Sequence, residues 1–367
     1  MITVSIVNVT SYTGLELLRL LAQHPQFAVT SVTGRSAAGK RLTEVFPHLS
    51  VLTKTGTGDD YAGTGVPAPA DLLITEEPET TDLAFVCLPH TAAAEAALTL
   101  LKRGTKVVDL SADFRLRNVT VYEEWYKHKH PAPALLESAV YGLCERYRER
   151  IQNASLIANP GCYATAAILA LLPALTAGII EPDVIIDAKS GVSGAGRSPT
   201  PGTHYAEANE DISAYSLNGH RHLPEITQEL EAAALAGGHP VHAGLRATFV
   251  PHLTPMTRGI LATCYADFNA DALPRFSTTA ELHSLYEEYY AGEPFVQVVD
   301  VAPHTKWTYG SNQCFIYPMV DTRARRLLVI SCLDNLVKGA AGQAIQNANR
   351  LYGLPETTAL AAVAVYP

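Results

Sequence analysis

The stretch that decides the fold opens the chain and reads Val4-Ser5-Ile6-Val7-Asn8-Val9-Thr10-Ser11-Tyr12-Thr13-Gly14-Leu15-Glu16-Leu17-Leu18-Arg19-Leu20-Leu21-Ala22. Its apolar residues predict a short buried strand over Val4–Val7 and, at helical spacing, a helix over Leu15–Ala22. A strand, a short turn and a helix in this order typically begin a doubly wound α/β domain. We therefore expect the first part of the chain to form such a domain.

The same alternation continues downstream of this opening. Strands are predicted over Ala28–Thr33, Asp82–Leu88 and Thr105–Asp109. An alanine-rich helix is predicted over Thr91–Arg103, and Gly104 after it is a typical helix end. This pattern predicts a Rossmann-type α/β fold, a parallel sheet with helices on both faces.

The pattern changes after Cys162, where strand-like runs are separated by only two clear helices, which predicts an α+β domain. These runs are Val184–Ala188, Leu245–Val250, Ile260–Phe268, Phe295–Val301 and Leu327–Leu333. A last helix over Asp334–Leu351 is expected to return to the first domain. At 367 residues the chain exceeds what one core usually supports. We expect a dinucleotide-binding domain from residues 1–158 and 334–367, and an α+β catalytic and oligomerisation domain from residues 159–333.

Composition limits the partners and the compartment. With 27 basic and 36 acidic side chains the formal net charge is −9, which argues against nucleic acids and anionic membranes as partners. The longest apolar stretch, Ala164–Leu175, is too short to cross a bilayer, and no export signal precedes the first strand. The six cysteines lack metal-ligand spacing and fit a reducing cytoplasm, so we expect no metal. A surface loop is expected over Thr53–Ala70, which is rich in Gly, Thr, Asp and Pro.

The turn between the first strand and the first helix is poor in glycine for a dinucleotide site, where glycines let the backbone approach pyrophosphate. Only Gly14 is present. Asn8 can adopt the left-handed conformation of a missing glycine, whereas Ser11 places a side chain where close approach is expected. The alternative is an ordinary strand–helix turn with Thr10 or Ser11 as helix cap.

The end of the second strand bears on the choice of cofactor. Gly34-Arg35-Ser36 follows it, with no carboxylate between Val29 and Thr43. An acid there favours NAD, whereas an arginine accommodates the additional phosphate of NADP, so NADP is favoured. The alternative is that Arg35 is only a solvated loop residue.

Cys162 is the candidate nucleophile. The segment Ile157–Thr165 joins a strand to an alanine- and leucine-rich helix, so Cys162 should stand at the N-terminus of that helix, where the dipole favours a thiolate. A lone cysteine is more often a small buried apolar residue. Of the six cysteines, however, only Cys162 follows a Pro-Gly turn and opens a helix.

Histidines and anion-binding loops supply the other groups that thiolate chemistry needs. Asn218–Glu225 contains His220 and His222, which can move protons near neutral pH, and Arg221, which can hold a carboxylate. Metal binding is the alternative, but His-Arg-His lacks a third local ligand. Ser111–Arg115 and Ser190–Arg197 offer hydroxyls, amides and guanidinium groups for a phosphate, although both could be mobile turns.

Together these segments resemble the N-acetyl-γ-glutamyl-phosphate reductase family of arginine biosynthesis, within the wider group that includes aspartate-semialdehyde dehydrogenase. The resemblance covers nearly the whole chain. The segments that carry it are Ser11–Leu17, Cys87–His90, Asp109–Arg115, Tyr141–Leu143, Asn159–Tyr163, Lys189–Arg197, His220–Glu225 and Asp334–Gln343. The chain departs from the family at Asn8 and Ser11, where members usually carry glycine.

The resemblance implies a role for each matched residue. It makes Cys162 the nucleophile and His220 or His222 the acid-base group, with Glu225 as a support. The substrate-binding residues that it implies are Arg115, Ser190, Gly191, Arg197 and Arg221. The cofactor-binding residues that it implies are Ser11, Tyr12, Thr13, Gly14, Pro89, Ser193, Gly194, Asn335 and Lys338. Arg35 and Ser36 join them because they follow the second strand, as described above. It also implies NADP(H) as cofactor and a homo-oligomer, either a dimer or a tetramer.

The implied reaction is the reduction of N-acetyl-γ-glutamyl phosphate to N-acetyl-glutamate 5-semialdehyde and phosphate. Cys162 attacks this small acyl phosphate, and the resulting thioester accepts hydride from NADPH. Two alternatives share this chemistry, with aspartyl phosphate or a carrier-bound aminoadipyl phosphate as substrate. A third, suggested by the glycine-poor turn, is a non-catalytic NADP-binding sensor.

Overall fold

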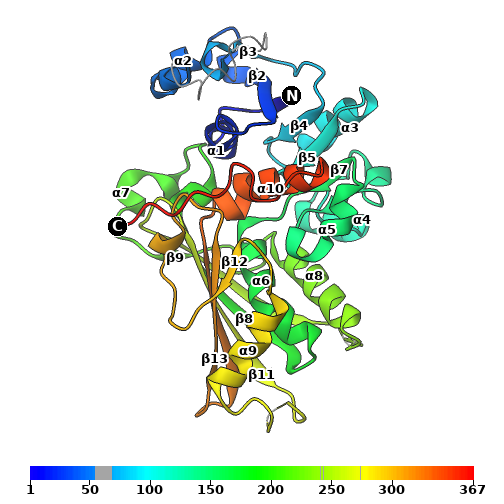
Figure 1. Ribbon diagram of the computed structural model, residues 1–367, viewed down its shortest axis with the longest axis vertical. Helices are drawn as coiled ribbons and strands as arrows, with labels where there is room; N and C mark the ends of the chain where they lie inside the picture. The colour runs from blue at the N-terminus through cyan, green and yellow to red at the C-terminus, as the bar shows by residue number, and fades with distance from the viewer. Residues whose placement is uncertain (54–67, 240, 243, 273) are drawn as a thin grey trace. The chain divides into compact units, whose positions relative to one another are not determined.

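The computed structural model describes residues 1–53, 68–239, 241–242, 244–272 and 274–367 (Figure 1). Most of the loop predicted over Thr53–Ala70 lies outside the described residues. The chain divides into two compact units, and each contains one sheet. The first unit comprises Met1–Pro160 and Ala340–Ala361, and the second comprises Gly161–Gly339 and Ala362–Pro367.

The first unit contains a parallel sheet with strand order β3-β2-β1-β4-β5-β7-β6. Its strands are β1 Ile2–Val7, β2 Phe27–Thr33, β3 Ile74–Thr75, β4 Leu83–Val86, β5 Lys106–Asp109, β6 Val140–Tyr141 and β7 Leu156–Ala158. Its helices are α1 Tyr12–Leu21, α2 Leu42–Val45, α3 Ala93–Lys102, α4 Val119–Tyr126, α5 Cys144–Gln152 and α10 Gly342–Leu351. The predicted Rossmann-type fold is confirmed. Because the strand order reverses between β1 and β4, the carboxyl ends of these two strands flank the crevice in which such folds bind ligands.

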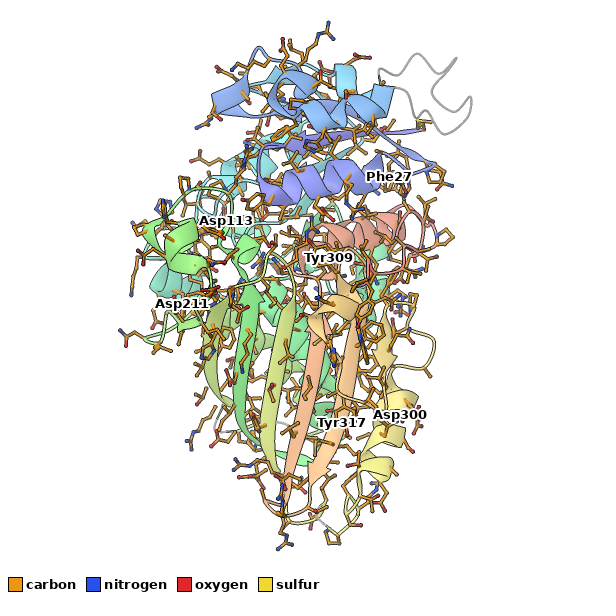
Figure 2. The ribbon with its side chains drawn as sticks, turned by 90° about the vertical axis from the view of Figure 1, so that its left-hand side faces the viewer. Phe27, Asp113, Asp211, Asp300, Tyr309 and Tyr317 are labelled. Atoms are coloured by element: carbon orange, nitrogen blue, oxygen red, sulfur yellow. The ribbon has the colours of Figure 1, made fainter. Side chains whose placement is uncertain are left out.

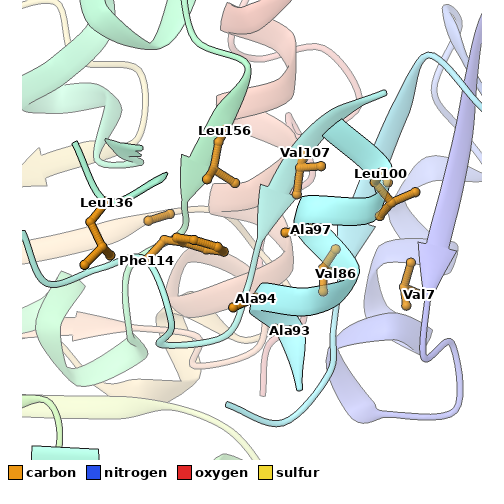
Figure 3. Close-up of a cluster of buried hydrophobic side chains, with 12 residues drawn as sticks. Val7, Val86, Ala93, Ala94, Ala97, Leu100, Val107, Phe114, Leu136 and Leu156 are labelled. Atoms are coloured by element: carbon orange, nitrogen blue, oxygen red, sulfur yellow. The ribbon is translucent and has the colours of Figure 1, made fainter. Parts of the chain in front are cut away.

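The core of this unit explains why its strands have continuous apolar sequences. All four residues of β4 are buried, as expected for a parallel strand covered on both faces. One core cluster joins β4, β5 and the small residues of α3 to Phe114 and Leu136 (Figure 3). Alanines on α3 let this helix approach the sheet closely, and Gly104 with φ +83° ends it, as predicted.

The second unit is the predicted α+β domain, with a mixed sheet of strand order β12-β13-β14-β11-β8-β10-β9. Its strands are β8 Ile180–Gly191, β9 Ser213–Ala214, β10 Arg246–Thr254, β11 Ile260–Phe268, β12 Val296–Val298, β13 Cys314–Asp321 and β14 Arg326–Leu333. Its helices are α6 Cys162–Thr176, α7 Tyr205–Ala208, α8 Leu223–Ala236 and α9 Thr279–Tyr289. The sequence analysis missed β13, which contains Pro318. Proline is tolerated there because pairing with β12 ends at Ile316, which leaves that side of β13 unpaired at Pro318.

The two faces of this sheet differ in how they are covered. The apolar helix α6 packs on β8, β11 and β14, and the residues of these strands that alternate toward it are buried. Figure 2 shows the opposite face, which we call the open face, turned toward the viewer. Its apolar side chains are only partly buried or exposed, and they include Ile185, Val250, Leu261, Tyr265, Phe315, Tyr317, Met319, Leu328 and Ile330. An apolar face of this width is typical of an association surface.

No helix among the described residues is both long enough and apolar enough to cross a membrane.

Candidate active site

Cys162 begins α6 in the second unit, as the sequence predicts. Gly161 before it is in extended conformation and caps the helix, and its N–H donates to Oε1 of the buried Glu225 at 2.8 Å. Five of the six cysteines are buried, and Cys162 is the partly exposed one. Burial raises the pKa of Cys87 and of Cys264 to about 12, which keeps those thiols protonated and unreactive. The site therefore presents one accessible thiol, at a helix end that stabilises negative charge.

Gly339 packs directly against Cys162, a contact that the sequence analysis missed. A Cβ atom on Gly339 would lie 2.7 Å from Cβ of Cys162 and 3.2 Å from Cδ1 of Leu333. Gly339 lies in the π-helical turn Val337–Ala341, a local distortion that recurs at functional sites. An isolated glycine inside a helical, alanine-rich pattern was the available signal, because such glycines usually have a packing reason.

Aromatic rings enclose His220 near this thiol. The ring centroids of Tyr163, Tyr215 and Phe249 lie 5.7, 5.6 and 5.3 Å from that of His220. Burial, reinforced by the charge of Arg221, lowers the pKa of His220 to about 4. His220 Nδ1 also accepts a hydrogen bond of 3.1 Å from the backbone N–H of His222. His220 is therefore a neutral imidazole at pH 7 whose proton is on Nε2.

His222 stands at the N-cap position of α8, and its ring centroid lies 4.7 Å from that of His220. The segment His220–Glu225 thus delivers two imidazoles and one carboxylate to the same place, as its sequence predicts. Arg221 between the histidines is exposed. Among the described residues, no three His, Cys, Asp or Glu side chains are arranged to hold a metal ion.

Two tyrosines that the sequence analysis did not assign complete the surroundings of the thiol. The Tyr163 hydroxyl donates to the backbone carbonyl of His252 at 3.0 Å and accepts from the Tyr215 hydroxyl at 3.3 Å. Burial, with a smaller contribution from a negative charge on Cys162, raises the pKa of Tyr215 to about 12. Tyr215 therefore stays protonated close to the thiol. It follows the two-residue strand β9, which is too short to be recognised from periodicity.

The loop after β8 gathers several of the predicted ligand-binding residues. The Asn335 side chain donates to Oγ of Ser193 at 2.9 Å and accepts from the N–H of Gly259 at 2.8 Å. Ser190 is buried, and a Cβ atom on Gly194 would lie 2.8 Å from its Oγ. Ser190, Ser193, Gly194 and Asn335 therefore form one cluster within the second unit, at the end of β8 where Gly191 also lies.

Two basic residues predicted for the same region differ from each other in their exposure. Arg197 is exposed beyond the short helical turn Val192–Ala195. Lys338 has no exposed surface, and its ammonium group lies 5.6 Å from the ring centroid of Phe295. Its side chain is therefore built into the interior of the second unit.

The turn between β1 and α1 in the first unit shows how the missing glycines are replaced. Asn8 has φ +68°, the left-handed conformation that the sequence predicts, and its Nδ2 donates to the carbonyl of Cys87 at 2.9 Å. Ser11 caps α1 by accepting from the N–H of Gly14 at 3.0 Å, so of the two expected cap residues Ser11 is the one that caps the helix. A Cβ atom on Gly14 would lie 2.6 Å from the carbonyl oxygen of Asn8, so a side chain there would have to displace the backbone of the turn.

Arg35 lies close to this turn. It is exposed in the short helical turn Arg35–Ala37, which directly follows β2. A Cβ atom on Gly34 would lie 3.1 Å from the Thr10 methyl group, so the two turns are packed together. The carboxyl ends of β1, β2 and β4 therefore gather all seven cofactor residues predicted in the first unit, namely Ser11, Tyr12, Thr13, Gly14, Arg35, Ser36 and Pro89. This arrangement fits a dinucleotide, with an exposed cation where NADP carries its extra phosphate.

Arg115 is not presented to solvent as a typical anion ligand would be. It is 7% exposed, and its Nε and Nη2 donate to the backbone carbonyls of Asn159 at 2.8 Å and Leu110 at 2.9 Å. Within the first unit, the guanidinium group therefore anchors the end of β7, three residues before Cys162.

Comparisons with known proteins give a matching family model for each of the two units. A family model described as "Semialdehyde dehydrogenase, NAD binding domain" matches residues 3–154, and one described as "Semialdehyde dehydrogenase, dimerisation domain" matches residues 162–335. An N-acetyl-gamma-glutamyl-phosphate reductase of Dehalococcoides mccartyi is 51% identical over 363 residues, covering 99% of this chain and 98% of the relative. Another, from Symbiobacterium thermophilum, is 49% identical over 375 residues, covering 100% of this chain and 99% of the relative.

Solved structures share the fold at much lower sequence identity. Aspartate semialdehyde dehydrogenase II from Vibrio cholerae superposes with a TM-score of 0.67 at 15% identity, over 96% of this chain and 99% of that one. Aspartate semialdehyde dehydrogenase with NADP from Candida albicans gives a TM-score of 0.67 at 15% identity, over 96% and 98% of the two chains.

Proposed function

Because the chain belongs to the N-acetyl-gamma-glutamyl-phosphate reductase family, we propose that it reduces N-acetyl-L-γ-glutamyl phosphate to N-acetyl-L-glutamate 5-semialdehyde and phosphate in arginine biosynthesis. The observation that carries this proposal is the single accessible thiol of Cys162 at a helix start, where two imidazoles pack near the ring of the next residue, Tyr163. We assign dinucleotide binding to the first unit, and catalysis and oligomerisation to the second.

NADPH is the proposed hydride donor. The residues that would hold it in the first unit are the β1–α1 turn, Arg35, Ser36 and Pro89. The cluster of Ser193, Gly194 and Asn335 is the proposed contribution of the second unit. Arg35 would pair with the 2′-phosphate, and the first turn of α1 offers backbone N–H groups to the pyrophosphate. When bound, the cofactor supplies the hydride that reduces the acyl carbon.

Cys162 performs the covalent part of the proposed reaction. Its sulfur attacks the acyl carbon, the carbon–oxygen bond to phosphate breaks, and the acyl group stays on the enzyme as a thioester. Ser190, Gly191 and Arg197 would receive the departing phosphate. After reduction, the carbon–sulfur bond breaks, its electron pair returns to sulfur, and the aldehyde leaves. The sulfur is released as a thiolate, and a proton taken up from solvent through His222 restores the starting thiol.

We assign the proton transfer to His222. A base for the Cys162 thiol needs a pKa near the working pH. His220, with a pKa of about 4, is too weak a base to hold the thiol proton. In this assignment His222 takes the thiol proton, which finally leaves with the phosphate. His220 orients His222 by accepting a hydrogen bond from its backbone N–H, and Glu225 orients Gly161 in the same way. Arg221, which is exposed beside the histidines, would hold the substrate carboxylate.

We propose a homo-oligomer, a dimer or a tetramer, that associates through the open face of the second unit. The match to a dimerisation domain over residues 162–335 and the partly exposed apolar side chains of this face support it. Replacing Tyr317 by lysine should disperse the assembly, because the charge would be buried in the interface. Light scattering of the eluted protein measures this, and an unchanged mass would exclude this face.

A cytoplasmic location is proposed as well. All six cysteines are thiols, and the thiolate chemistry assigned to Cys162 requires a reducing environment. Fractionation of cells that express the tagged chain tests the location.

The reaction is tested in the oxidative direction. Purified protein is given phosphate and NADP with either N-acetyl-glutamate semialdehyde, aspartate semialdehyde or a carrier-bound aminoadipate semialdehyde, and NADPH formation is recorded. We expect turnover with the first only, and its loss in Cys162→Ser with the fold intact. Preference for another semialdehyde reassigns the substrate. NADPH binding without turnover of any of them indicates a sensor.

A further inference from the structure

The chain passes between its two units three times, and two of these passages adjoin the thiol. The first lies between Pro160 and Gly161, directly before Cys162, and the second between Gly339 and Ala340. On the side of the second unit, Gly339 packs against Cys162. On the side of the first unit, Asn159 Nδ2 donates to the carbonyl of Ala340 at 3.1 Å. The two passages are thus tied together at both ends.

Asn159 is held through all of its polar groups. Its N–H donates to the carbonyl of Asp109 at 2.8 Å, and its carbonyl accepts from Arg115 at 2.8 Å. Its side chain donates to Ala340 and accepts from Nδ2 of Asn347 at 3.0 Å. With 1% of its surface exposed, Asn159 has no freedom to adopt another orientation. The chain therefore leaves the first unit, three residues before the thiol, from a fixed point.

Asn347 on α10 sets one side of that point. It is fully buried, and besides Asn159 its Nδ2 donates to the carbonyl of Gly142 at 2.7 Å, while its Oδ1 accepts from the thiol of Cys144 at 3.1 Å. A Cβ atom on Gly142 would lie 2.5 Å from Nδ2 of Asn347, so the amide occupies the space that a side chain at position 142 would need. Burying an amide is unfavourable unless every bond is made, and an apolar residue would fill the space at lower cost. An amide here is thus selected for its directional bonds.

We propose that Asn347 is a positioning residue for Cys162. With Asn159 and the Ala340 carbonyl it forms what we call the asparagine clamp, which fixes where the chain leaves the first unit and hence how the thiol is presented at the start of α6. Asn347 touches neither the reacting sulfur nor the substrate in this role. The effect on turnover rests on the proposed function, whereas the effect on the chemical reactivity of the thiol does not.

The same helix provides a matched control. Asn349 is also a fully buried asparagine of α10 and makes a similar set of bonds. Its Nδ2 donates to the carbonyls of Glu356 and Thr358, and its Oδ1 faces Nε2 of His24 at 2.9 Å. Loss of either side chain should lower the unfolding temperature similarly, because each removes buried hydrogen bonds. Only Asn347 is part of the asparagine clamp.

The experiment compares Asn347→Ala, Asn159→Ala and Asn349→Ala by kinetics and by alkylation of Cys162 with iodoacetamide over a range of pH, with Cys162→Ser as background. We expect Asn347→Ala and Asn159→Ala to lower kcat by about 10- to 100-fold with KM changed less than about threefold, because misplaced reacting groups cost about that much. They should also change the rate or the pH midpoint of alkylation. The double variant should be no worse than the worse single one, because both act through one contact. Asn349→Ala should leave kcat and alkylation within about twofold of the parent.

Three results would overturn the proposal. The first is an unchanged alkylation profile in folded Asn347→Ala, and the second is an equal change in Asn349→Ala. The third is a double variant in which the two effects simply add. If Asn347→Ala does not fold, Asn159→Ala decides alone, since it leaves α10 intact. If no acyl phosphate is turned over, the proposed function fails, while the alkylation profiles still decide the role of Asn347.

Discussion

Replacing Gly339 by alanine tests how closely the second unit is built around the thiol. The added methyl group would lie 2.7 Å from Cβ and 3.2 Å from Cα of Cys162, and 3.2 Å from Cδ1 of Leu333. Carbon atoms rest at about 3.5–4.0 Å, so Cys162 or the Val337–Ala341 turn must move by about 0.8 Å or more. Two of the three nearest atoms belong to Cys162, so the thiol cannot be spared by a simple rotation of Leu333.

The magnitude follows from two opposing effects. Overpacking a core costs about 1–3 kcal/mol, whereas exchanging glycine for alanine in a helix recovers up to about 1 kcal/mol. The net loss of stability is therefore about 1–2 kcal/mol, which the chain should tolerate. Activity is more sensitive, because a displacement of about 1 Å at a reacting group costs about 100-fold in kcat. We expect a folded protein that has lost most of its turnover.

The assay measures kcat and the unfolding temperature of Gly339→Ala beside Gly202→Ala. A Cβ atom on Gly202 meets no heavy atom within 4 Å, so that variant should retain both values. A folded Gly339→Ala enzyme with kcat within about threefold of the parent would refute the reasoning, since the clash would then be relieved without moving the thiol.

Three further predictions concern titration and cofactor choice. His220 is neutral in the folded protein, with a pKa of about 4 against about 6.5 when unfolded, so its contribution to stability is lost as pH falls from 6.5 toward 4. His220→Asn should flatten that fall by up to about 3 kcal/mol in chemical denaturation. Burial raises the pKa of Asp109 to about 7, so its contribution is present at acid pH and is lost as pH rises through 7. The unfolding temperature of Asp109→Asn should therefore exceed that of the parent by more at pH 8 than at pH 5. Arg35→Ala should weaken NADPH about 10- to 100-fold and NADH little, because one charge-assisted bond is worth about 1.5–3 kcal/mol.

Each of these has an opposite outcome that contradicts it. A His220→Asn protein whose stability falls with acid as steeply as the parent would mean that His220 is charged in the fold. An unchanged pH dependence in Asp109→Asn would mean that the carboxylate is ionised despite its burial. Equal losses of binding affinity for NADPH and NADH in Arg35→Ala would mean that Arg35 contacts a part of the cofactor that both share.

Much of the fold was predictable because its signals are local. The strand, turn and helix at the start of the chain follow from periodicity over about twenty residues. The start of α6 at Cys162 follows from a Pro-Gly turn and an apolar run. Even the left-handed Asn8 was expected, since asparagine tolerates that conformation. The strand β13 was missed because Pro318 contradicts its pattern, and only its neighbours show why proline is tolerated there.

The site was predictable only where its residues are sequence neighbours. Gly339 meets Cys162 across 177 positions, and its only local signal, a glycine inside an alanine-rich helical pattern, does not name the partner. Tyr215 follows the two-residue strand β9 and has no local signal. Arg115 shows the converse. A guanidinium after a strand predicts an anion ligand, and that role stays a prediction, but its bonds to the carbonyls of Leu110 and Asn159 have no signal in the sequence. Residue type limits what a side chain can do, and only the contacts show which task it performs.

The glycine-poor turn is the clearest case in which a departure from the family pattern changes the interpretation once contacts are known. A glycine at position 8 would supply the left-handed conformation, but it could not donate to the carbonyl of Cys87 at the end of β4. Asn8 does both, and so joins the ends of the two strands between which the sheet reverses its order. Ser11 in turn occupies the N–H of Gly14 and leaves the earlier N–H groups of α1 for a ligand. The substitutions therefore stiffen the cradle instead of abolishing it, which favours a reductase over a sensor that has lost its chemistry.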